Sequence, residues 1–210
     1  GKTHVKSREK TLKGKLTLAE KLYSGQQHVR LMRGVELVRS SKNQVDLDFQ
    51  ILSAGYGLIP ANRKIAPYET TFQGMKKTEL REWAAQLNIP KDFKKVISEK
   101  RHFNLILLGD SYLEACGITD EQEFVSPTLL FCGKGTAKKI KTRLNLRVVT
   151  LSNPEAKRFS CGLVGLKGEI AHRICAGLAS GKLTAKKLTN TKTDVLSLLD
   201  GVKLKEPKSV

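Results

Sequence analysis

The stretch LSAGYGLIPANRKIAPYETTF, residues 52–72, follows the first strong strand signal of the chain. That strand, VDLDFQILS at residues 45–53, begins by alternating polar and apolar residues and ends in an apolar run, as a buried strand does. The connection over residues 53–72 is long, and loops of this length are usually functional or disordered. Its aromatic and apolar residues argue against disorder, so we expect a functional loop.

Helical and strand patterns alternate on both sides of this loop. The sequence predicts helices at 17–22 (with Thr17 as N-cap), 26–39, 75–87, 92–100, 112–116, 136–143, 164–179 and 194–199. It predicts further strands at 103–109, 128–132 and 146–151. Strands that alternate with helices, some of them almost wholly apolar, predict an α/β fold with three layers: a mostly parallel central sheet with helices on both faces.

We expect a single α/β nucleic-acid-processing domain over residues 1–180 and a basic C-terminal helical segment and tail over 181–210. Residues 1–14 resemble the loop that follows a strand, so either the sheet starts later or its first strand precedes Gly1. In a parallel sheet, ligands bind outside the carboxyl ends of the strands. Candidate residues should therefore lie in the loops after Ser53, Gly109, Cys132 and Leu151.

Positive charge is the strongest compositional signal. The 210 residues contain 38 Lys and Arg against 20 Asp and Glu, a formal net charge of +18. Basic residues recur in three separate regions, near residues 1–40, 124–154 and 182–208, and not in one amphipathic helix, which favours nucleic acid over a membrane surface as the partner. We expect double-stranded DNA with an extruded base; a merely solvated basic surface is the alternative.

Several classes of protein have no support in the sequence. No apolar run approaches the roughly 20 residues that span a bilayer, and the N-terminus lacks an apolar signal region, so we expect a cytoplasmic protein. The four cysteines contain no CxxC pair, and we expect reduced, mostly buried thiols, no metal and no cofactor. Walker A, GxSxG and HExxH motifs are absent.

The long loop contains the main candidate residues. Gly55 and Gly57 flank Tyr56 and indicate a tight turn that starts at Ser53. Tyr56 and Tyr68 could stack on a base, and Glu69 could activate water or stabilise a cationic sugar. The expected substrate-binding residues are Ser53, Tyr56, Gly57, Tyr68, Tyr112 and Asn153. An equally good interpretation is that both tyrosines pack the loop onto the domain while Glu69 pairs with Arg63 or Lys64.

Three later loops supply further candidates. Asp110 in GDSYL could bind a ribose hydroxyl or a base edge beside Tyr112, or could cap the next helix. GKGTAKK (133–139) follows a strand and opens a helix, which suits a phosphate or an ordinary turn. Asn153 could read a base edge or start a turn with Pro154. The predicted phosphate-binding residues are Lys2, Lys15, Arg63, Lys134, Lys138 and Lys139.

Several motifs of residues 1–115 occur together in one known family. They are GKT at the N-terminus, AEKLYSG (19–25), LSAGYGL followed by APYE, ELREWA (79–84) and LILLGDSYL (105–113). This set resembles a family of bacterial domains related to the peroxide-stress protein YaaA, whose signature is LSAxYGL followed by PYD. Two departures are the absence of the strand and cysteine expected before Gly1, and Glu69 in place of Asp.

The resemblance implies a fold related to the uracil-DNA-glycosylase superfamily, with Tyr56, Gly57, Tyr68, Glu69 and Asp110 in its pocket. By this analogy we expect a DNA glycosylase that flips and excises a modified base, with Glu69 and Asp110 as catalytic residues and a role in antiviral defence against phages. The alternatives are a non-catalytic DNA-binding stress protein and a tRNA base-modifying enzyme.

Overall fold

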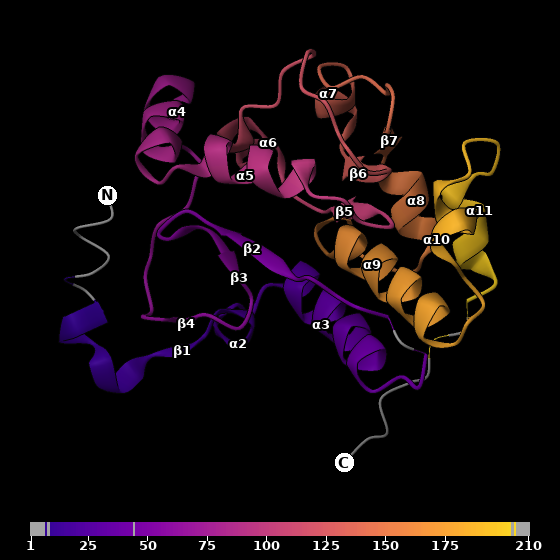
Figure 1. Ribbon diagram of the computed structural model, residues 1–210, viewed down its shortest axis with the longest axis horizontal. Coiled ribbons are helices and arrows are strands. Elements are labelled where there is room, and N and C mark those ends of the chain that lie inside the picture. The colour runs from indigo at the N-terminus through magenta and orange to yellow at the C-terminus, as the bar shows by residue number, and fades with distance from the viewer. Residues whose placement is uncertain (1–6, 8, 44, 203, 205–210) are drawn as a thin grey trace. The chain divides into compact units, whose positions relative to one another are not determined.

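The computed structural model of the chain describes residues 7, 9–43, 45–202 and 204 (Figure 1). The chain divides into two compact units, each formed by two separate stretches of sequence. The strand unit is Gly1–Tyr23 with Asp48–Thr150, and the helical unit is Ser24–Leu47 with Leu151–Val210. Residues 181–202 fall in the helical unit, and the domain boundary expected at residue 180 stays a prediction.

The strand unit contains a parallel sheet of three strands in the order β5 (Asn104–Ile106), β6 (Thr128–Cys132) and β7 (Leu146–Thr150). Leu130 of β6 pairs with Ile106 on one side and with Val148 on the other. All five residues of β6 are buried, as its continuous apolar sequence predicts for a central strand. The α/β class is therefore confirmed, although helices predominate.

Two small antiparallel pairs complete the strands of this unit. β1 (Thr17–Leu18) pairs with β4 (Lys64–Ile65), and β2 (Gln50–Ser53) pairs with β3 (Gly57–Pro60). The prediction that residues 45–53 form a strand of a mostly parallel sheet is wrong, because only residues 50–53 form a strand and they pair antiparallel. The long loop is thus largely a hairpin followed by β4.

Gly57 makes this hairpin possible. Its φ of +78° lies in the left-handed region, and a Cβ there would lie 2.8 Å from the carbonyl oxygen of Leu87. The chain can therefore reverse after Ser53, so that Ser53 pairs with Gly57 and Leu52 with Leu58. The predicted tight turn is confirmed, because Ser53 and Gly57 at its two ends pair with each other.

Short helices surround these strands. They are α2 (Ala19–Leu22), α4 (Lys77–Gln86), α5 (Ile89–Ser98), α6 (Asp110–Cys116) and α7 (Lys134–Ala137), with a 3₁₀ turn at Lys13–Lys15. Phe72, Leu113 and Leu130 are among the fully buried residues of their shared core. Thr17 caps no helix, because it lies in β1, and the break before α5 falls at Asn88, whose φ is 60°.

The helical unit is built on two long helices, α3 (Gln26–Arg39) and α9 (Leu163–Ala179), with α8 (Asn153–Arg158), α10 (Ala185–Thr189) and α11 (Val195–Asp200). The range of α3 was predicted correctly, and the expected apolar face of α9 is confirmed by buried Leu166, Ile170 and Ile174. Within the described part of the chain, no helix is long and apolar enough to cross a membrane.

Glycines let α3 and α9 approach closely (Figure 1). A Cβ at Gly34 would lie 2.8 Å from the Cα of His172, and a Cβ at Gly168 would collide with the backbone of Gln27. Since Gly168 faces Gln27 and Gly34 faces His172, the two helices run parallel. Their spacing therefore depends on the absence of side chains at these two positions.

Candidate functional site

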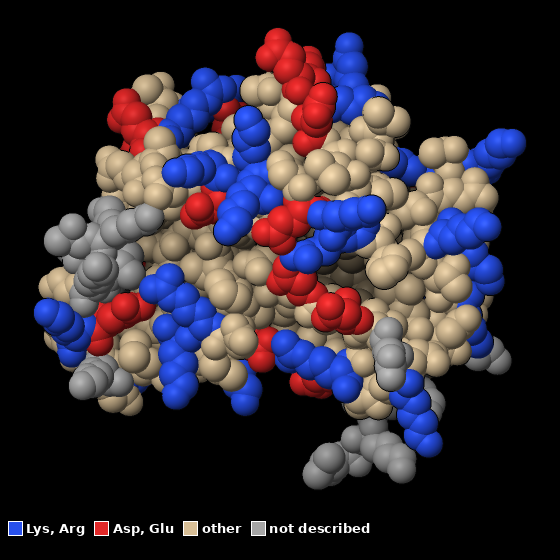
Figure 2. Space-filling view, viewed as in Figure 1, with Lys and Arg blue, Asp and Glu red and all other residues tan. Residues whose placement is uncertain are grey.

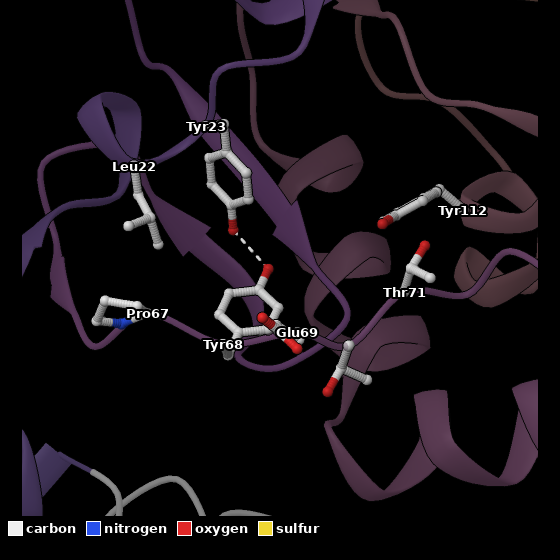
Figure 3. A pocket seen from close by; sticks show the side chains of 8 residues that line it. Leu22, Tyr23, Pro67, Tyr68, Glu69, Thr71 and Tyr112 are labelled. Atoms are coloured by element: carbon white, nitrogen blue, oxygen red, sulfur yellow. Dashed lines mark hydrogen bonds between the residues drawn. The ribbon is translucent and has the colours of Figure 1, made fainter.

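An open pocket of about 540 Å³ lies within the strand unit (Figure 3). Its walls come from the end of α2, from residues 67–71 and from α6. The lining side chains are those of Leu22, Tyr23, Pro67, Tyr68, Glu69, Thr70, Thr71 and Tyr112. Among these described residues none is Lys or Arg, and Glu69 supplies the single formal charge. In a chain with a net charge of +18, this local composition is unusual.

Ser53 connects the hairpin turn to the pocket wall. Its Oγ accepts the backbone N–H of Gly55 at 3.2 Å and of Tyr56 at 3.0 Å, and it donates to the Tyr68 hydroxyl at 2.6 Å. The Tyr68 ring lies directly over Gly55, where a Cβ would approach Cδ2 to 2.8 Å. The glycine that the sequence marks as a turn residue therefore also makes room for the tyrosine ring.

Tyr68 occupies the centre of an aromatic cluster. Its hydroxyl forms a 2.7 Å hydrogen bond with that of Tyr23 (Figure 3), and its ring lies edge-on to the rings of Tyr23 and Tyr56, with centroids 6.5 and 5.5 Å away. Burial raises the pKa of Tyr68 well above its ordinary value, which outweighs the opposing hydrogen bond from Ser53. Tyr68 is therefore a neutral phenol at physiological pH.

Tyr56 packs beneath this cluster and does not line the pocket. Its side chain is buried, with the hydroxyl accepting the N–H of Ala66 at 2.9 Å and donating to the carbonyl of the same residue at 3.3 Å. The guanidinium of Arg63 lies 5.3 Å from the centre of its ring. Tyr56 holds the loop in place, as the packing alternative predicts, and is not exposed for stacking on a base.

Glu69 is an exposed carboxylate in the pocket wall. The alternative in which it pairs with Arg63 or Lys64 is wrong, because neither of these described residues forms an ion pair with Glu69, and Arg63 pairs with Glu9 at 3.2 Å instead. Over the described residues, Glu69 takes part in no ion pair or side-chain hydrogen bond. Its charge is therefore available to a ligand.

Only one of the two candidates in the GDSYL motif lines the pocket. Tyr112 does so, with its ring edge-on to Phe72 at 5.1 Å. Asp110 is the exposed first residue of α6, and the N-cap is Gly109, so Asp110 neither caps the helix nor belongs to the pocket lining. The structure thus brings Tyr112 together with Glu69 but does not add Asp110 to them.

The described members of the predicted phosphate-binding set lie on separate elements, with three of them at or just after α7. Lys2 lies outside the described residues, Lys15 ends the 3₁₀ turn, and Lys134 begins α7, a helix of 4 residues. Lys138 and Lys139 follow it and are exposed. Figure 2 shows Lys and Arg side chains spread over the visible face with Asp and Glu among them. Their role as phosphate ligands stays a prediction.

Asn153 belongs to the helical unit and is the exposed first residue of α8. The cap of that helix is Ser152, whose backbone N–H and hydroxyl both donate to Glu155 at 2.8 and 2.7 Å. Asn153 is not among the residues that line the pocket of the strand unit. Its contact with a base stays a prediction as well.

Sequence reasoning missed Tyr23, Thr70 and Thr71 as lining residues. Tyr23 stands in the AEKLYSG motif, which supported the family resemblance without suggesting a role for the tyrosine. All 4 tyrosines of the chain lie in or directly beneath the pocket, which is a signal that the sequence alone does not reveal. The free cysteines include three buried thiols, as expected, and Cys161 is half-buried.

A comparison with protein-family models matches residues 7–141 to a family of unknown function, DUF6884. The chain belongs to this family. No curated protein and no solved structure matches the chain. The segment matched to DUF6884 contains every residue that lines the pocket, from Leu22 to Tyr112. The pocket is thus built entirely from the DUF6884 part of the chain.

Proposed function

We propose that this protein binds nucleic acid and acts on a base held in the tyrosine pocket, as a DNA glycosylase that excises a modified base. The observation that carries the proposal is the composition of the pocket wall. Three tyrosines and two threonines surround one carboxylate that has no ion pair over the described residues, in a chain with a net charge of +18. Such a wall suits an uncharged, flat and polar group.

The charges of the protein predict where the phosphates and the base of a bound strand lie. A phosphate is repelled by Glu69 and finds no cation in the pocket lining, so the phosphates of a bound strand should lie outside the pocket on the basic surface. A base that leaves the stack can enter and contact the aromatic side chains, since base–aromatic stacking contributes about 1–3 kcal/mol for each base. Tyr112 is the tyrosine of the lining that takes no part in the Ser53–Tyr68–Tyr23 hydrogen bonds.

Glu69 has the chemistry that base excision requires. A carboxylate can deprotonate a water molecule that adds to C1′ of the sugar while the bond from C1′ to the base nitrogen breaks, and the base leaves with the bonding electron pair. It can also stabilise the cationic sugar that forms as this bond lengthens. In this scheme Glu69 is the catalytic residue, and Asp110 has a supporting role at most.

The resemblance to YaaA-related domains is the second support. The motifs that carry it provide Tyr23, Ser53, Tyr68 and Tyr112, all of which belong to the pocket wall or bond to it. A relationship to the uracil-DNA-glycosylase superfamily, with its three-layer sheet, is part of the same proposal. Modified phage DNA is the substrate class we favour.

The test is incubation of the protein with duplexes that carry modified or ordinary bases, followed by alkali to cleave abasic sites. We expect cleavage on at least one modified duplex, and we expect Glu69→Gln to abolish it while binding measured by fluorescence anisotropy is retained. Glu82→Gln is the matched control, because Glu82 is an exposed carboxylate on α4 away from the pocket lining.

Other outcomes would assign a different function. If DNA binds but no abasic site forms on any substrate, the glycosylase proposal is wrong and a non-catalytic DNA-binding protein is the better description. If folded RNA binds much more tightly than DNA, a tRNA base-modifying enzyme is indicated instead.

A further inference from the structure

Residues 181–192 of the helical unit form a basic surface segment, the lysine segment, which follows the part of the chain matched to DUF6884. Its sequence is GKLTAKKLTNTK, without Asp or Glu. All of its lysines are exposed, at positions 182, 186, 187 and 192. Figure 2 shows Lys and Arg side chains projecting from the part of the visible face where Figure 1 labels α10.

Two buried leucines hold the lysine segment on the helical unit. Leu183 packs over Gly177 of α9, where a Cβ would lie 2.4 Å from its Cδ1, and Leu188 of α10 is fully buried. Thr184 caps α10 by accepting the backbone N–H of Lys187 at 3.3 Å. The backbone that carries the lysines is therefore ordered before any partner binds, which lowers the entropic cost of binding.

The positive charges of the lysine segment are not balanced by acids. Over the described residues none of its lysines forms an ion pair, and Lys187 Nζ donates to the carbonyl oxygen of Lys182 at 3.2 Å. The acids that follow, Asp194 and Asp200, pair with Arg158 instead, at 3.9 and 2.5 Å. A solvated surface normally mixes both signs of charge, so this segment favours a polyanionic partner.

The side chains of the lysine segment suit phosphate better than a lipid bilayer. Thr184, Thr189 and Thr191 stand among the lysines, and hydroxyl and ammonium groups both donate to phosphate oxygens. A helix that lies on a membrane exposes apolar side chains for insertion, whereas both leucines of this segment are buried.

We propose that the lysine segment binds the phosphate backbone of double-stranded DNA. This inference rests on the proposed function and deepens it, because it assigns a backbone contact to the helical unit, outside the set of phosphate-binding residues predicted from the sequence. Phosphate contacts carry no sequence information, so the lysine segment contributes equally to the binding of modified and unmodified duplexes.

The test is the salt dependence of duplex binding, measured by fluorescence anisotropy between 50 and 200 mM salt. We expect the double variant Lys186→Gln, Lys187→Gln to bind every duplex more weakly and to reduce the slope of log K against log salt by about 2, because each lost phosphate contact removes about 0.9. Lys186→Arg with Lys187→Arg should retain the wild-type slope, because arginine keeps the charge.

The matched control is Lys94→Gln with Lys95→Gln, an adjacent and exposed lysine pair on α5 in the strand unit. It removes the same net charge from a different surface, and we expect the wild-type slope to change by less than half as much. Thermal unfolding curves that match the wild-type curve exclude misfolding as the cause of weaker binding.

The outcomes separate this inference from the function on which it rests. If the wild type binds duplexes but the variant at residues 186 and 187 keeps its slope, or loses no more than the control does, the lysine segment is not the contact surface and nucleic-acid binding stands. If the wild type binds phosphatidylserine vesicles and no duplex, both proposals fail.

Discussion

One carboxylate in each unit, Glu169 in the helical unit and Glu69 in the strand unit, has an opposite environment in burial and ion pairing. In the helical unit Glu169 is only 4% exposed and accepts from Arg30 at 2.7 Å and from Arg173 at 3.0 Å. Arg173 also stacks on Phe159, 5.2 Å from the ring centre. In the strand unit Glu69 is exposed in the wall of an open pocket and, over the described residues, pairs with no cation.

This difference separates a structural charge from a functional one. A buried carboxylate held by two guanidinium groups has its hydrogen-bonding capacity filled by the protein itself, so its removal should cost stability. An exposed carboxylate among hydroxyl groups contributes little to folding and is available to a ligand. Substitutions in each unit should therefore change different measured quantities.

The largest effect is expected at the contact between α3 and α9. Gly168→Val places carbon atoms against the backbone of Gln27, which cannot move aside without separating the helices. We expect the free energy of unfolding to fall by about 3 kcal/mol or more, measured by chemical denaturation. Gly201→Ala is the control, because a Cβ there meets nothing within 4 Å and its φ of −76° suits any residue, so it should change stability by less than about 0.5 kcal/mol.

The two carboxylates provide the next comparison. Glu169→Gln leaves the largely buried Arg173 without its charged partner, and we expect a loss of about 2–3 kcal/mol in the free energy of unfolding. Glu69→Gln should change it by less than about 0.5 kcal/mol. Equal losses in the two variants would contradict the distinction between a structural and a functional carboxylate.

Within the strand unit, Tyr56 should have a structural role and Tyr112 a role at the pocket. Tyr56→Phe removes the partner of the buried Ala66 N–H and should lower the free energy of unfolding by about 1–2 kcal/mol. Tyr112→Phe, at the pocket wall, should lower it by less than about 0.5 kcal/mol. A larger loss of stability for Tyr112→Phe than for Tyr56→Phe would contradict the structural role of Tyr56.

The smallest effect is a pH dependence of the helical unit. Burial lowers the pKa of His172, so the unfolded chain takes up a proton at a higher pH than the folded chain does. The contribution of neutral, buried His172 to the free energy of unfolding should be fully present above about pH 6.5. It should be lost as the pH falls through the lowered pKa, by about 1.4 kcal/mol for each unit by which the pKa is lowered. His172→Asn should weaken this decline in denaturation measured between pH 5 and 7, whereas His102→Asn, at an exposed position, should not.

Local sequence patterns predicted most helices because their signals lie within a few residues. The bounds of α3 and the apolar face of α9 follow from helical spacing, and β6 from its apolar run. The pairing of β2 could not be predicted in this way. Residues 45–53 have the composition of a central strand, yet the turn at Gly57 returns the chain beside β2 before any crossover can form.

The candidate site was predicted only in part, because local patterns identify residues within one loop but not those brought together by tertiary structure. Glu69, Tyr68 and Tyr112 were identified from the loops that contain them, and the structure brings them together in one pocket. Tyr56 was predicted to stack on a base because an aromatic residue between two glycines suggests an exposed turn. Its hydroxyl instead forms hydrogen bonds with the backbone of Ala66, and its ring is buried. Tyr23 reaches the pocket only through tertiary structure, 45 residues from Tyr68 along the chain.

The central claim is that a base of bound nucleic acid occupies the tyrosine pocket. The most direct test is NMR of the protein with ¹³C-labelled tyrosine rings, whose 4 ring systems all lie in or beneath this pocket, during titration with an oligonucleotide. We expect large shifts for Tyr23, Tyr68 and Tyr112 and the smallest shift for the buried Tyr56. Saturable binding that leaves the signals of Tyr23, Tyr68 and Tyr112 unchanged would contradict the account.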